Sequence, residues 1–489
     1  MTMVPSSQPK KKLLLILPVA PEIRFFSSEA DEPLNPPLAL AYIAALTPPE
    51  EWDITVIDEN CEIFRYREAD LVGISSITQN AARAYEIATL YRQNQVPVVI
   101  GGWHASAVPE EAARYADAVV VGEAEDVWPQ LLEDLRRGRV QKIYRGGRVD
   151  LEKWGGIRPR RDIFNPRHKY PMAAVQFSRG CPGQCEFCTI PAMYGAKVRY
   201  RPVEEVLDEL ESIREKAVFF IDDNFIGYST AHQKQTMELL RGIVRRGIEL
   251  RWFGQGSINV YQNEEMLDWM QTSGCAWMLS GLESVDRTML EDIRKGANAA
   301  LDYRHAVSTL HRRKIALLAT WVVGYPGQTA REIMDILDFC LEADVDLPVP
   351  TMASVNPGSG WWDKYSESLP FKDFPRDYTK VSGMYMPWIL PGSKITWPEW
   401  QEIWRTVADK LYSWPRTLKT LWRWTRQGDH YNAWILFESY MGMRKYYRRL
   451  SQLDRWVDLK TGEFRPDGSA GNPERLDAAV LGPGVTGRS

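Results

Sequence analysis

The chain has 489 residues, of which 44% are hydrophobic and 25% are charged, and its formal net charge is −4. This composition is typical of a globular protein, and the length predicts two or three domains that each bury a core. Because the net charge is weakly negative, the chain as a whole has no positive electrostatic potential that would attract nucleic acid. No apolar run reaches the roughly 18–20 residues needed to span a bilayer.

Cysteine usage points to a reducing compartment. Six cysteines are present, and Cys61, Cys275 and Cys340 are scattered along the chain. Such a distribution does not suggest a disulfide framework. The apolar run 13–17 is too short for the core of a signal peptide and is predicted to be a strand. We therefore expect a cytoplasmic protein.

Strands and helices alternate over the first third of the chain. Short apolar runs predict buried strands, and Pro36 and Pro37 open a helical pattern. This alternation predicts an α/β fold with a doubly wound, Rossmann-like parallel sheet over residues 10–150. The predicted strands are 13–17, 52–57, 71–76, 96–102 and 118–123, and the predicted helices are 38–46 and 80–93.

Small and polar residues follow the third, fourth and fifth predicted strands. Ligands of doubly wound sheets bind at the carboxyl ends of the strands, which is where these residues fall. Ordinary glycine turns would explain each residue singly, whereas the set as a whole indicates a binding site. The candidates are Ser75, Ser76, Thr78, Gly101, Gly102, Gly122 and Glu123.

Together with the strand order, this set resembles the cobalamin-binding domain that precedes the catalytic domain of many radical S-adenosylmethionine (SAM) enzymes. The resemblance implies that the nucleotide tail of cobalamin threads between sheet and helices past these residues. The D-x-H-x-x-G histidine that ligates cobalt in other cobalamin proteins is missing, since no histidine precedes His104. Three possibilities stay open: cobalt without a protein histidine, His104 as the lower ligand, and a sheet that is only a scaffold.

The loop 178–188 carries Cys181, Cys185 and Cys188 at the spacing C-x3-C-x2-C. Thiolates this close on one loop suit an iron–sulfur cluster, and three ligands leave one iron of a [4Fe–4S] cluster open. Zinc competes, but it usually takes paired C-x2-C or Cys/His sets, and only His168 lies nearby. Three buried structural cysteines are the other alternative, which the intervening glycine and proline disfavour.

This loop resembles that of the radical SAM enzymes, whose CxxxCxxC signature precedes a partial (β/α) barrel. The resemblance implies that Cys181, Cys185 and Cys188 hold a [4Fe–4S] cluster. Its open iron would chelate the amine and carboxylate of SAM. Phe187 matches the family's aromatic residue near the adenine.

Strands and helices alternate again behind the cysteines, which predicts a (β/α)6 partial TIM barrel over residues 165–360. The predicted strands are 218–221, 251–259, 276–284 and 317–324, with a helix at 203–216. Polar residues at the strand ends fall on the face where barrels place their active sites. The polar residues are Asp222, Asp223, Asn224, Gln255, Ser257 and Glu283, and Gly324 is the candidate at the end of the last strand.

The radical SAM resemblance gives several of these residues expected roles. Residues 222–224 would hydrogen-bond the charged amine of SAM, and Glu283 would hold the ribose diol. Gly324 begins a turn similar to the family's G-x-P-G-E-T turn beside the adenine, with glutamine replacing the glutamate. For each of these residues taken alone, the alternative is a side chain that caps a helix or a polar side chain that is hydrogen-bonded within the barrel. We expect His305 and His311 on a solvated helix face.

Tryptophan, tyrosine, arginine and lysine become frequent after the barrel. Residues 361–458 are predicted to form a helical, Trp-rich domain, with one helix at 397–412. The turn-rich loop 385–392 could close over the barrel mouth.

Residues 414–424 and 443–450 mix basic and aromatic side chains. Two explanations stay open: a helical cap that packs its tryptophans on the barrel, and a surface that meets lipid headgroups. Residues 459–489 are rich in glycine, proline and aspartate, and we expect them to be disordered.

A radical SAM site beside cobalamin implies a reaction at an unactivated carbon, which acid–base side chains cannot perform. The family's usual outcome is methylation through a 5′-deoxyadenosyl radical and methylcobalamin. Residues 12 to about 360 most resemble the hopanoid C-methylases and the anaerobic Mg-protoporphyrin ester cyclase. We expect a C-methyltransferase for an apolar substrate such as a hopanoid lipid. The alternatives are a radical cyclase or hydroxylase acting on a tetrapyrrole, and a binding protein that senses cobalamin or redox state.

The expected partners follow from this chemistry. They are a small apolar substrate and an electron donor such as flavodoxin or ferredoxin. Nucleic acid is not expected, because no RNA-binding module is visible and the net charge is acidic. The basic and aromatic segments leave peripheral contact with the inner face of the membrane open.

Overall fold

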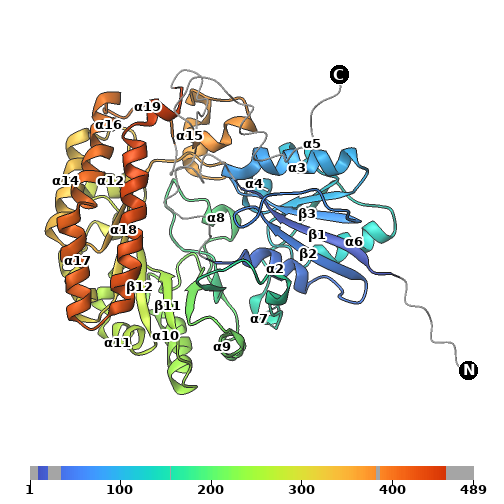
Figure 1. The fold of residues 1–489 in the computed structure, drawn as a ribbon, viewed down its shortest axis with the longest axis horizontal. Helices are drawn as coiled ribbons and strands as arrows, with labels where there is room; N and C mark the ends of the chain where they lie inside the picture. The colour runs from blue at the N-terminus through green and yellow to red at the C-terminus, as the bar shows by residue number, and fades with distance from the viewer. Residues whose placement is uncertain (1–8, 20–34, 155, 382–385, 459–489) are drawn as a thin grey trace, which may run out of the picture.

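A computed structural model describes residues 9–19, 35–154, 156–381 and 386–458. Two six-stranded parallel sheets form its centre, with the first third of the chain at one end and the C-terminal helices at the other (Figure 1). The tail 459–489 and Tyr385, the first residue of the predicted loop, lie outside the described residues.

The first sheet has the strand order β2-β1-β3-β4-β5-β6, and neighbouring strands run parallel. The strands predicted from the apolar runs are confirmed, and the short β6 was not predicted. The bounds are β1 (Lys11–Leu17), β2 (Trp52–Asp58), β3 (Leu71–Ser75), β4 (Val98–Gly101), β5 (Ala118–Val121) and β6 (Ile143–Arg145).

Helices cover both faces of this sheet, because successive side chains of a buried strand point to opposite sides. Leu13 and Leu15 of β1 share a core with Trp128. Leu14 and Ile16 belong to the core on the other face. The helices are α2 (Leu38–Ala45), α3 (Ala81–Gln93), α4 (Trp103–Ala107), α5 (Pro109–Tyr115) and α6 (Trp128–Arg136). The doubly wound fold is therefore confirmed.

The second sheet has the order β14-β13-β12-β11-β10-β7, so six parallel strands form an open barrel with β7 and β14 at its edges. This is the predicted (β/α)6 architecture. Its strands are β7 (Ala173–Val175), β10 (Ala217–Phe220), β11 (Arg251–Gln255), β12 (Cys275–Glu283), β13 (Ala316–Val323) and β14 (Leu347–Met352). Its helices are α9 (Val203–Ser212), α10 (Thr230–Arg245), α11 (Glu264–Thr272), α12 (Arg287–Asp292), α13 (Tyr303–Arg312) and α14 (Ala330–Glu342).

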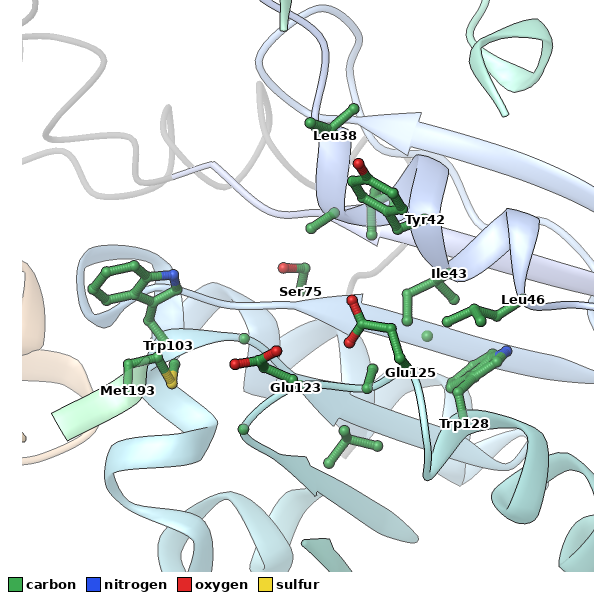
Figure 2. A pocket seen from close by; sticks show the side chains of 18 of the residues that line it. Leu38, Tyr42, Ile43, Leu46, Ser75, Trp103, Glu123, Glu125, Trp128 and Met193 are labelled. Atoms are coloured by element: carbon green, nitrogen blue, oxygen red, sulfur yellow. The ribbon is translucent and has the colours of Figure 1, made fainter. Parts of the chain in front are cut away.

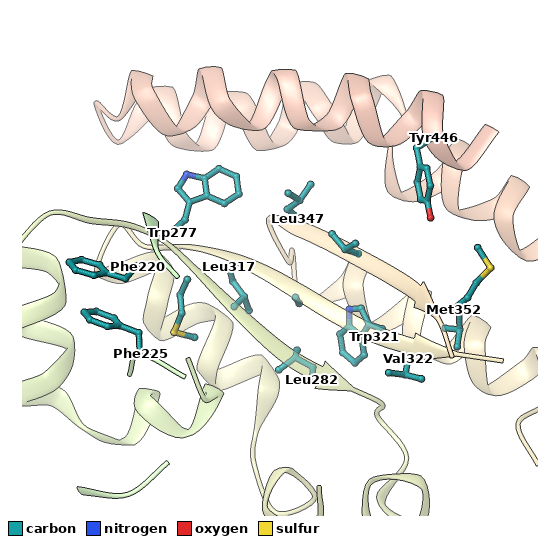
Figure 3. Close-up of a cluster of buried hydrophobic side chains, with 14 of the residues drawn as sticks. Phe220, Phe225, Trp277, Leu282, Leu317, Trp321, Val322, Leu347, Met352 and Tyr446 are labelled. Atoms are coloured by element: carbon teal, nitrogen blue, oxygen red, sulfur yellow. The ribbon is translucent and has the colours of Figure 1, made fainter. Parts of the chain in front are cut away.

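The C-terminal helices protect the exposed edge of the barrel. Strand β14 contains Pro348 and Pro350, which lack a backbone N–H and are typical of edge strands. Tyr447 donates a hydrogen bond of 2.8 Å to the carbonyl of Pro350, and Tyr412 donates one to the carbonyl of Pro348. Figure 3 shows a long helix alongside the barrel core. The elements are α15 (Gly360–Tyr365), α16 (Trp397–Thr406), a π turn (Val407–Leu411), α17 (Trp414–Arg426), α18 (His430–Leu450) and α19 (Leu453–Trp456).

Asp346 joins the barrel to these helices, and this corrects the expectation that His311 lies on a solvated face. His311 Nε2 lies 2.8 Å from the fully buried Asp346, which also accepts a 2.8 Å hydrogen bond from Trp424 Nε1. Burial alone would raise the pKa of Asp346. His311 and Arg423 outweigh burial and hold that pKa well below its usual range. His311 therefore belongs to a buried polar junction.

Candidate functional site

The loop that carries the three cysteines lies between β8 (Ser178–Arg179) and α8 (Ile190–Met193). Gly180 has a φ of +99°, and a Cβ added there would lie 2.7 Å from the carbonyl oxygen of Lys197, so the turn requires glycine. Cys181, Cys185 and Cys188 are half-buried and form no disulfide.

The environment of these three thiols suits the binding of positively charged iron. Burial raises the pKa of all three, and that of Cys188 to about 12. Bound iron would compensate the buried thiolates. No three His, Cys, Asp or Glu side chains of the described residues are grouped to hold a single metal ion. A cubane cluster differs, because each of its thiolate ligands binds a different iron atom.

Two aspartates after β10 anchor the cysteine loop. Asp222 is fully buried and accepts hydrogen bonds of 3.0 Å from the backbone N–H of Phe177 and 2.6 Å from Ser178 Oγ. Asp223 accepts one of 3.0 Å from the N–H of Gly180. Burial raises the pKa of Asp222 to about 7 and that of Asp223 to about 6. Their roles toward SAM stay predictions, and the observed contacts position the loop.

A side-chain hydrogen bond joins the segment that follows β10 to the segment that follows β11. Asn224 Nδ2 donates to Ser257 Oγ at 2.9 Å, and Gln255 is half-buried at the end of β11. Tyr228 was not predicted as a site residue. A Cβ added at Gly183, between the first two cysteines, would lie 3.5 Å from the Tyr228 hydroxyl. The Tyr228 side chain therefore faces the cysteine loop.

Glu283 forms a buried ion pair that the sequence did not indicate. Its carboxylate lies 2.7 Å from Lys295 Nζ, and both side chains are mostly buried. Glu283 has a φ of +66°, a strained conformation for a non-glycine residue and one that clusters at functional sites. Desolvation alone would lower the pKa of Lys295, but Glu283 raises it above its usual value, so the Lys295 ammonium stays charged. Lys295 also offsets the effect of burial on Cys185.

Phe187 and Gly324 lie against the C-terminal part of the chain. The ring of Phe187 is 5.6 Å from that of Trp361. Gly324 has a φ of +83°. Its N–H donates a hydrogen bond of 2.6 Å to the side-chain oxygen of Gln328, so the Gln328 side chain stabilises the turn. The N–H of Gly327 donates to the carbonyl of Gly392 at 2.7 Å. The described part of the predicted closing loop thus packs on this turn.

A cavity of ≈ 310 Å³ runs from the interior of the first sheet to the cysteine loop. Figure 2 shows that Tyr42, Ile43 and Leu46 line one side, with Trp103 at one end of the cavity and Trp128 at the other. Arg179 and Asp223 close the end toward the cysteines. Five of the seven candidate residues of the first sheet line this cavity, namely Ser75, Gly101, Gly102, Gly122 and Glu123.

Ser76, Thr78 and His104 do not line this cavity. Ser76 is buried, and Thr78 lines a second cavity of ≈ 510 Å³, which shares Trp103, Gly122 and Met193 with the first. His104 is fully buried, and its ring nitrogens lie 3.4 Å from Thr78 Oγ1 and 3.3 Å from Glu111. His104 is therefore close to protein side chains on both ring nitrogens and does not line the first cavity.

The first cavity suits a large ligand that carries hydrogen-bond acceptors. The hydroxyl of Tyr42 is buried in its wall and has no hydrogen-bond partner among the described residues. Burial raises the pKa of Tyr42 to about 12, so this group is a donor at neutral pH. Gly101 and Gly122 keep the strand ends open. A buried donor without a partner and side-chain-free strand ends fit a ligand such as the cobalamin tail.

Buried ion pairs join this cavity to the cysteine loop. Glu123 accepts hydrogen bonds of 2.9 Å from both Arg179 and Arg199, and Arg179 also lies 2.6 Å from Glu125. Glu123 was predicted to contact a cofactor. It does line the cavity, but its carboxylate is engaged by two arginines from the segment that contains the cysteines.

Two family models match the chain: the B12 binding domain over residues 32–132 and the Radical SAM superfamily over residues 175–340. An uncharacterized methyltransferase of Pyrococcus horikoshii is 30% identical and aligns with 72% of this chain and 83% of its own. The bacteriochlorophyllide d C-12(1)-methyltransferase of Chlorobaculum tepidum is 28% identical over 90% of this chain and 94% of its own. The hopanoid C-2 methylase of Rhodopseudomonas palustris is 27% identical over 67% of this chain and 64% of its own.

Among solved structures, the chain is similar to TsrM of Kitasatospora setae, a radical SAM methyltransferase with cobalamin and a [4Fe–4S] cluster bound. The TM-score is 0.59 at 20% identity, and the match covers 74% of this chain and 78% of that one. At this identity the similarity establishes the common fold.

Proposed function

The chain belongs to the radical SAM enzymes that carry a B12-binding domain, and on that premise we propose that it methylates an unactivated carbon of a large apolar ring system. Its cofactors are a [4Fe–4S] cluster, SAM and cobalamin. When bound, these groups supply the radical and methyl-transfer chemistry that amino acid side chains lack.

The protein residues bind, orient and exclude water. Cys181, Cys185 and Cys188 would hold the cluster, on a loop positioned by Asp222 and Asp223. The buried Glu283–Lys295 pair would meet the charged and hydroxyl groups of SAM.

Cobalamin would occupy the cavity of Figure 2, with its nucleotide tail between the sheet and α2. Trp103, Gly122 and Met193 are shared by the two cavities, so they would contact both a ligand of the first cavity and a ligand of the second. The proposed units are 10–150 for cobalamin, 165–360 for the cluster and SAM, and 361–458 for the C-terminal cap.

The substrate we propose first is a tetrapyrrole, methylated on a peripheral carbon. The observation that carries this choice is the extent of similarity to the bacteriochlorophyllide methyltransferase, which covers 90% of this chain and so continues beyond the barrel into the C-terminal helices. A hopanoid lipid, the substrate class expected from the sequence, is the second candidate, because hopanoid methylases are also relatives. An oxidative cyclisation is supported less, since the cyclase of Rubrivivax gelatinosus is 23% identical over 65% of this chain.

A product assay tests this proposal. Anaerobically reconstituted protein would be incubated with SAM, cobalamin, a reductant such as reduced flavodoxin, and either a chlorophyllide or a hopanoid. We expect 5′-deoxyadenosine together with a chlorophyllide product that is heavier by one CH2 unit. A methylated hopanoid alone would move the substrate to the second candidate. A product that has gained oxygen or lost hydrogen would contradict methyl transfer.

A further inference from the structure

The hairpin of α17 and α18 carries all of the strongly exposed tryptophans of the described residues. Trp414, Leu418 and Trp422 of α17 are 48%, 61% and 62% exposed, and Trp434 of α18 is 59% exposed. The three residues of α17 recur every four positions and therefore share one side of the helix. We call these four side chains the tryptophan stripe.

Helix α17 turns a mixed polar and aromatic side toward the protein. That side contains Arg416, Thr417, Thr420 and Trp424, all buried. Arg416 Nη2 donates hydrogen bonds of 2.6 Å to the carbonyl of Val345 and 3.2 Å to that of Cys340. A helix on a purely aqueous surface points its apolar side inward. The barrel edge therefore takes the side of α17 that carries Arg416 and Trp424, and the tryptophan stripe stays exposed and is left for another apolar or interfacial environment.

The surroundings of the stripe are basic. Helix α17 contains no acidic residue, and α18 contains only Glu438. The guanidinium of Arg426 lies 5.2 Å from the ring of Trp422, and that of Arg444 lies 5.6 Å from the ring of Trp414. Within the described part of the chain, Arg426, Arg444 and Lys445 form no ion pair. The exposed side chains of Arg426 and Lys445 are thus available to phosphate groups beside the exposed rings.

We propose that the tryptophan stripe docks on the surface of a bilayer that contains anionic phospholipid. Indole rings favour the headgroup region, where arginine and lysine meet lipid phosphates. No helix of the described residues is long and apolar enough to cross a bilayer, so this contact is peripheral. The docking goes beyond the proposed reaction, and it would bring the enzyme to substrates that partition into lipid.

Vesicle co-sedimentation of the full-length protein tests this docking. We expect binding to vesicles of phosphatidylglycerol and phosphatidylcholine, and little binding to phosphatidylcholine alone. The double variant Leu418→Ser/Trp422→Ser should bind about tenfold more weakly, because it removes apolar area from the interface. Ile63→Ser is the matched control, since Ile63 is 60% exposed on the first sheet's side of the molecule and should leave binding unchanged.

Charge reversal tests the basic component separately. Arg426→Glu and Lys445→Glu should each weaken binding to anionic vesicles about fivefold or more, with a smaller effect at high salt. Lys234→Glu, at an exposed position of α10, is the matched control. Circular dichroism should be unchanged for every variant, because the buried side of α17 is untouched.

Several outcomes would overturn the proposal. One is absence of binding to anionic vesicles at low salt, and another is equal binding by the wild type and the stripe variant. A dimer that the stripe variant dissociates, without vesicle binding, would assign the surface to a second copy of the chain. Vesicle binding needs no turnover, so its failure would leave the proposed reaction standing.

Discussion

The three thiols of the cysteine loop are the residues on which the chemistry depends most directly. Cys185→Ala removes one ligand of the cluster, and we expect loss of iron loading and of 5′-deoxyadenosine formation. The fold should persist, because Cys185 is half-buried and lies on a loop. Iron content and SAM cleavage after anaerobic reconstitution measure the effect.

Cys275→Ala is the control for that variant, because Cys275 is buried in β12 and lies outside the loop. It should load iron normally and lose only stability. SAM cleavage retained by Cys185→Ala would contradict the cluster assignment.

Gly101 offers the clearest test of the cobalamin cavity. A Cβ at Gly102 would lie 2.5 Å from the carbonyl oxygen of Ser76, so any side chain there would strain the backbone. A Cβ at Gly101 would lie 3.6 Å from Val120 Cβ, which is ordinary contact, and both residues line the cavity. Gly101→Phe should therefore weaken cobalamin binding at least about tenfold by filling the cavity. Absorbance of bound cobalamin after desalting measures this loss.

Iron loading serves as the internal control for Gly101→Phe. The substitution is made in the first sheet, so the cysteine loop should still take up its cluster. Normal cobalamin retention by this variant would place the cofactor elsewhere.

At the scale of elements, the buried carboxylate of Asp346 ties β14 to α13 and α17. Asp346→Asn leaves His311 without its anionic partner and Arg423 with only the carboxylate of Asp344, 3.5 Å away. We expect this to cost about 3–5 kcal/mol of unfolding free energy at pH 7. The pKa of Asp346 is lowered in the folded state. Its contribution is therefore present above the ordinary aspartate pKa and is lost as the pH falls below it.

Denaturant unfolding at several pH values checks this prediction. The variant should show a smaller decrease in stability under acid than the wild type. Asp409→Asn is the control, because Asp409 pairs with Arg448 on the surface and should contribute less than about 1 kcal/mol. Equal losses of unfolding free energy in the two variants would show that the buried junction contributes no more than a surface ion pair.

At the scale of the whole molecule, Glu123 couples the cobalamin cavity to the cysteine loop through Arg179 and Arg199. Glu123→Gln removes the charge from a buried carboxylate between two arginines, so we expect the loop 178–188 to open more often. Its amide hydrogens should exchange about tenfold faster, which corresponds to the loss of about 1.4 kcal/mol of local stability.

Hydrogen exchange measured by mass spectrometry would detect this loosening. Glu110→Gln is the matched control, because Glu110 pairs with Arg145 on the surface and should leave the loop unchanged. Unchanged exchange in Glu123→Gln would mean that the two halves of the molecule are held together elsewhere.

Local patterns in the sequence determined the two parallel sheets, the cysteine loop and the C-terminal helix at 397–412, because apolar runs and turn residues act over a few neighbours. They also placed Ser75, Gly101, Gly102, Gly122 and Glu123 at strand ends that one cavity joins. Only the tertiary structure decided the partners of these residues. Lys295 pairs with Glu283, and His311 with Asp346, across turns and strands that no spacing rule connects. The exposed side of α17 likewise depends on which of its residues the barrel edge accepts, since burial is a property of the assembled fold.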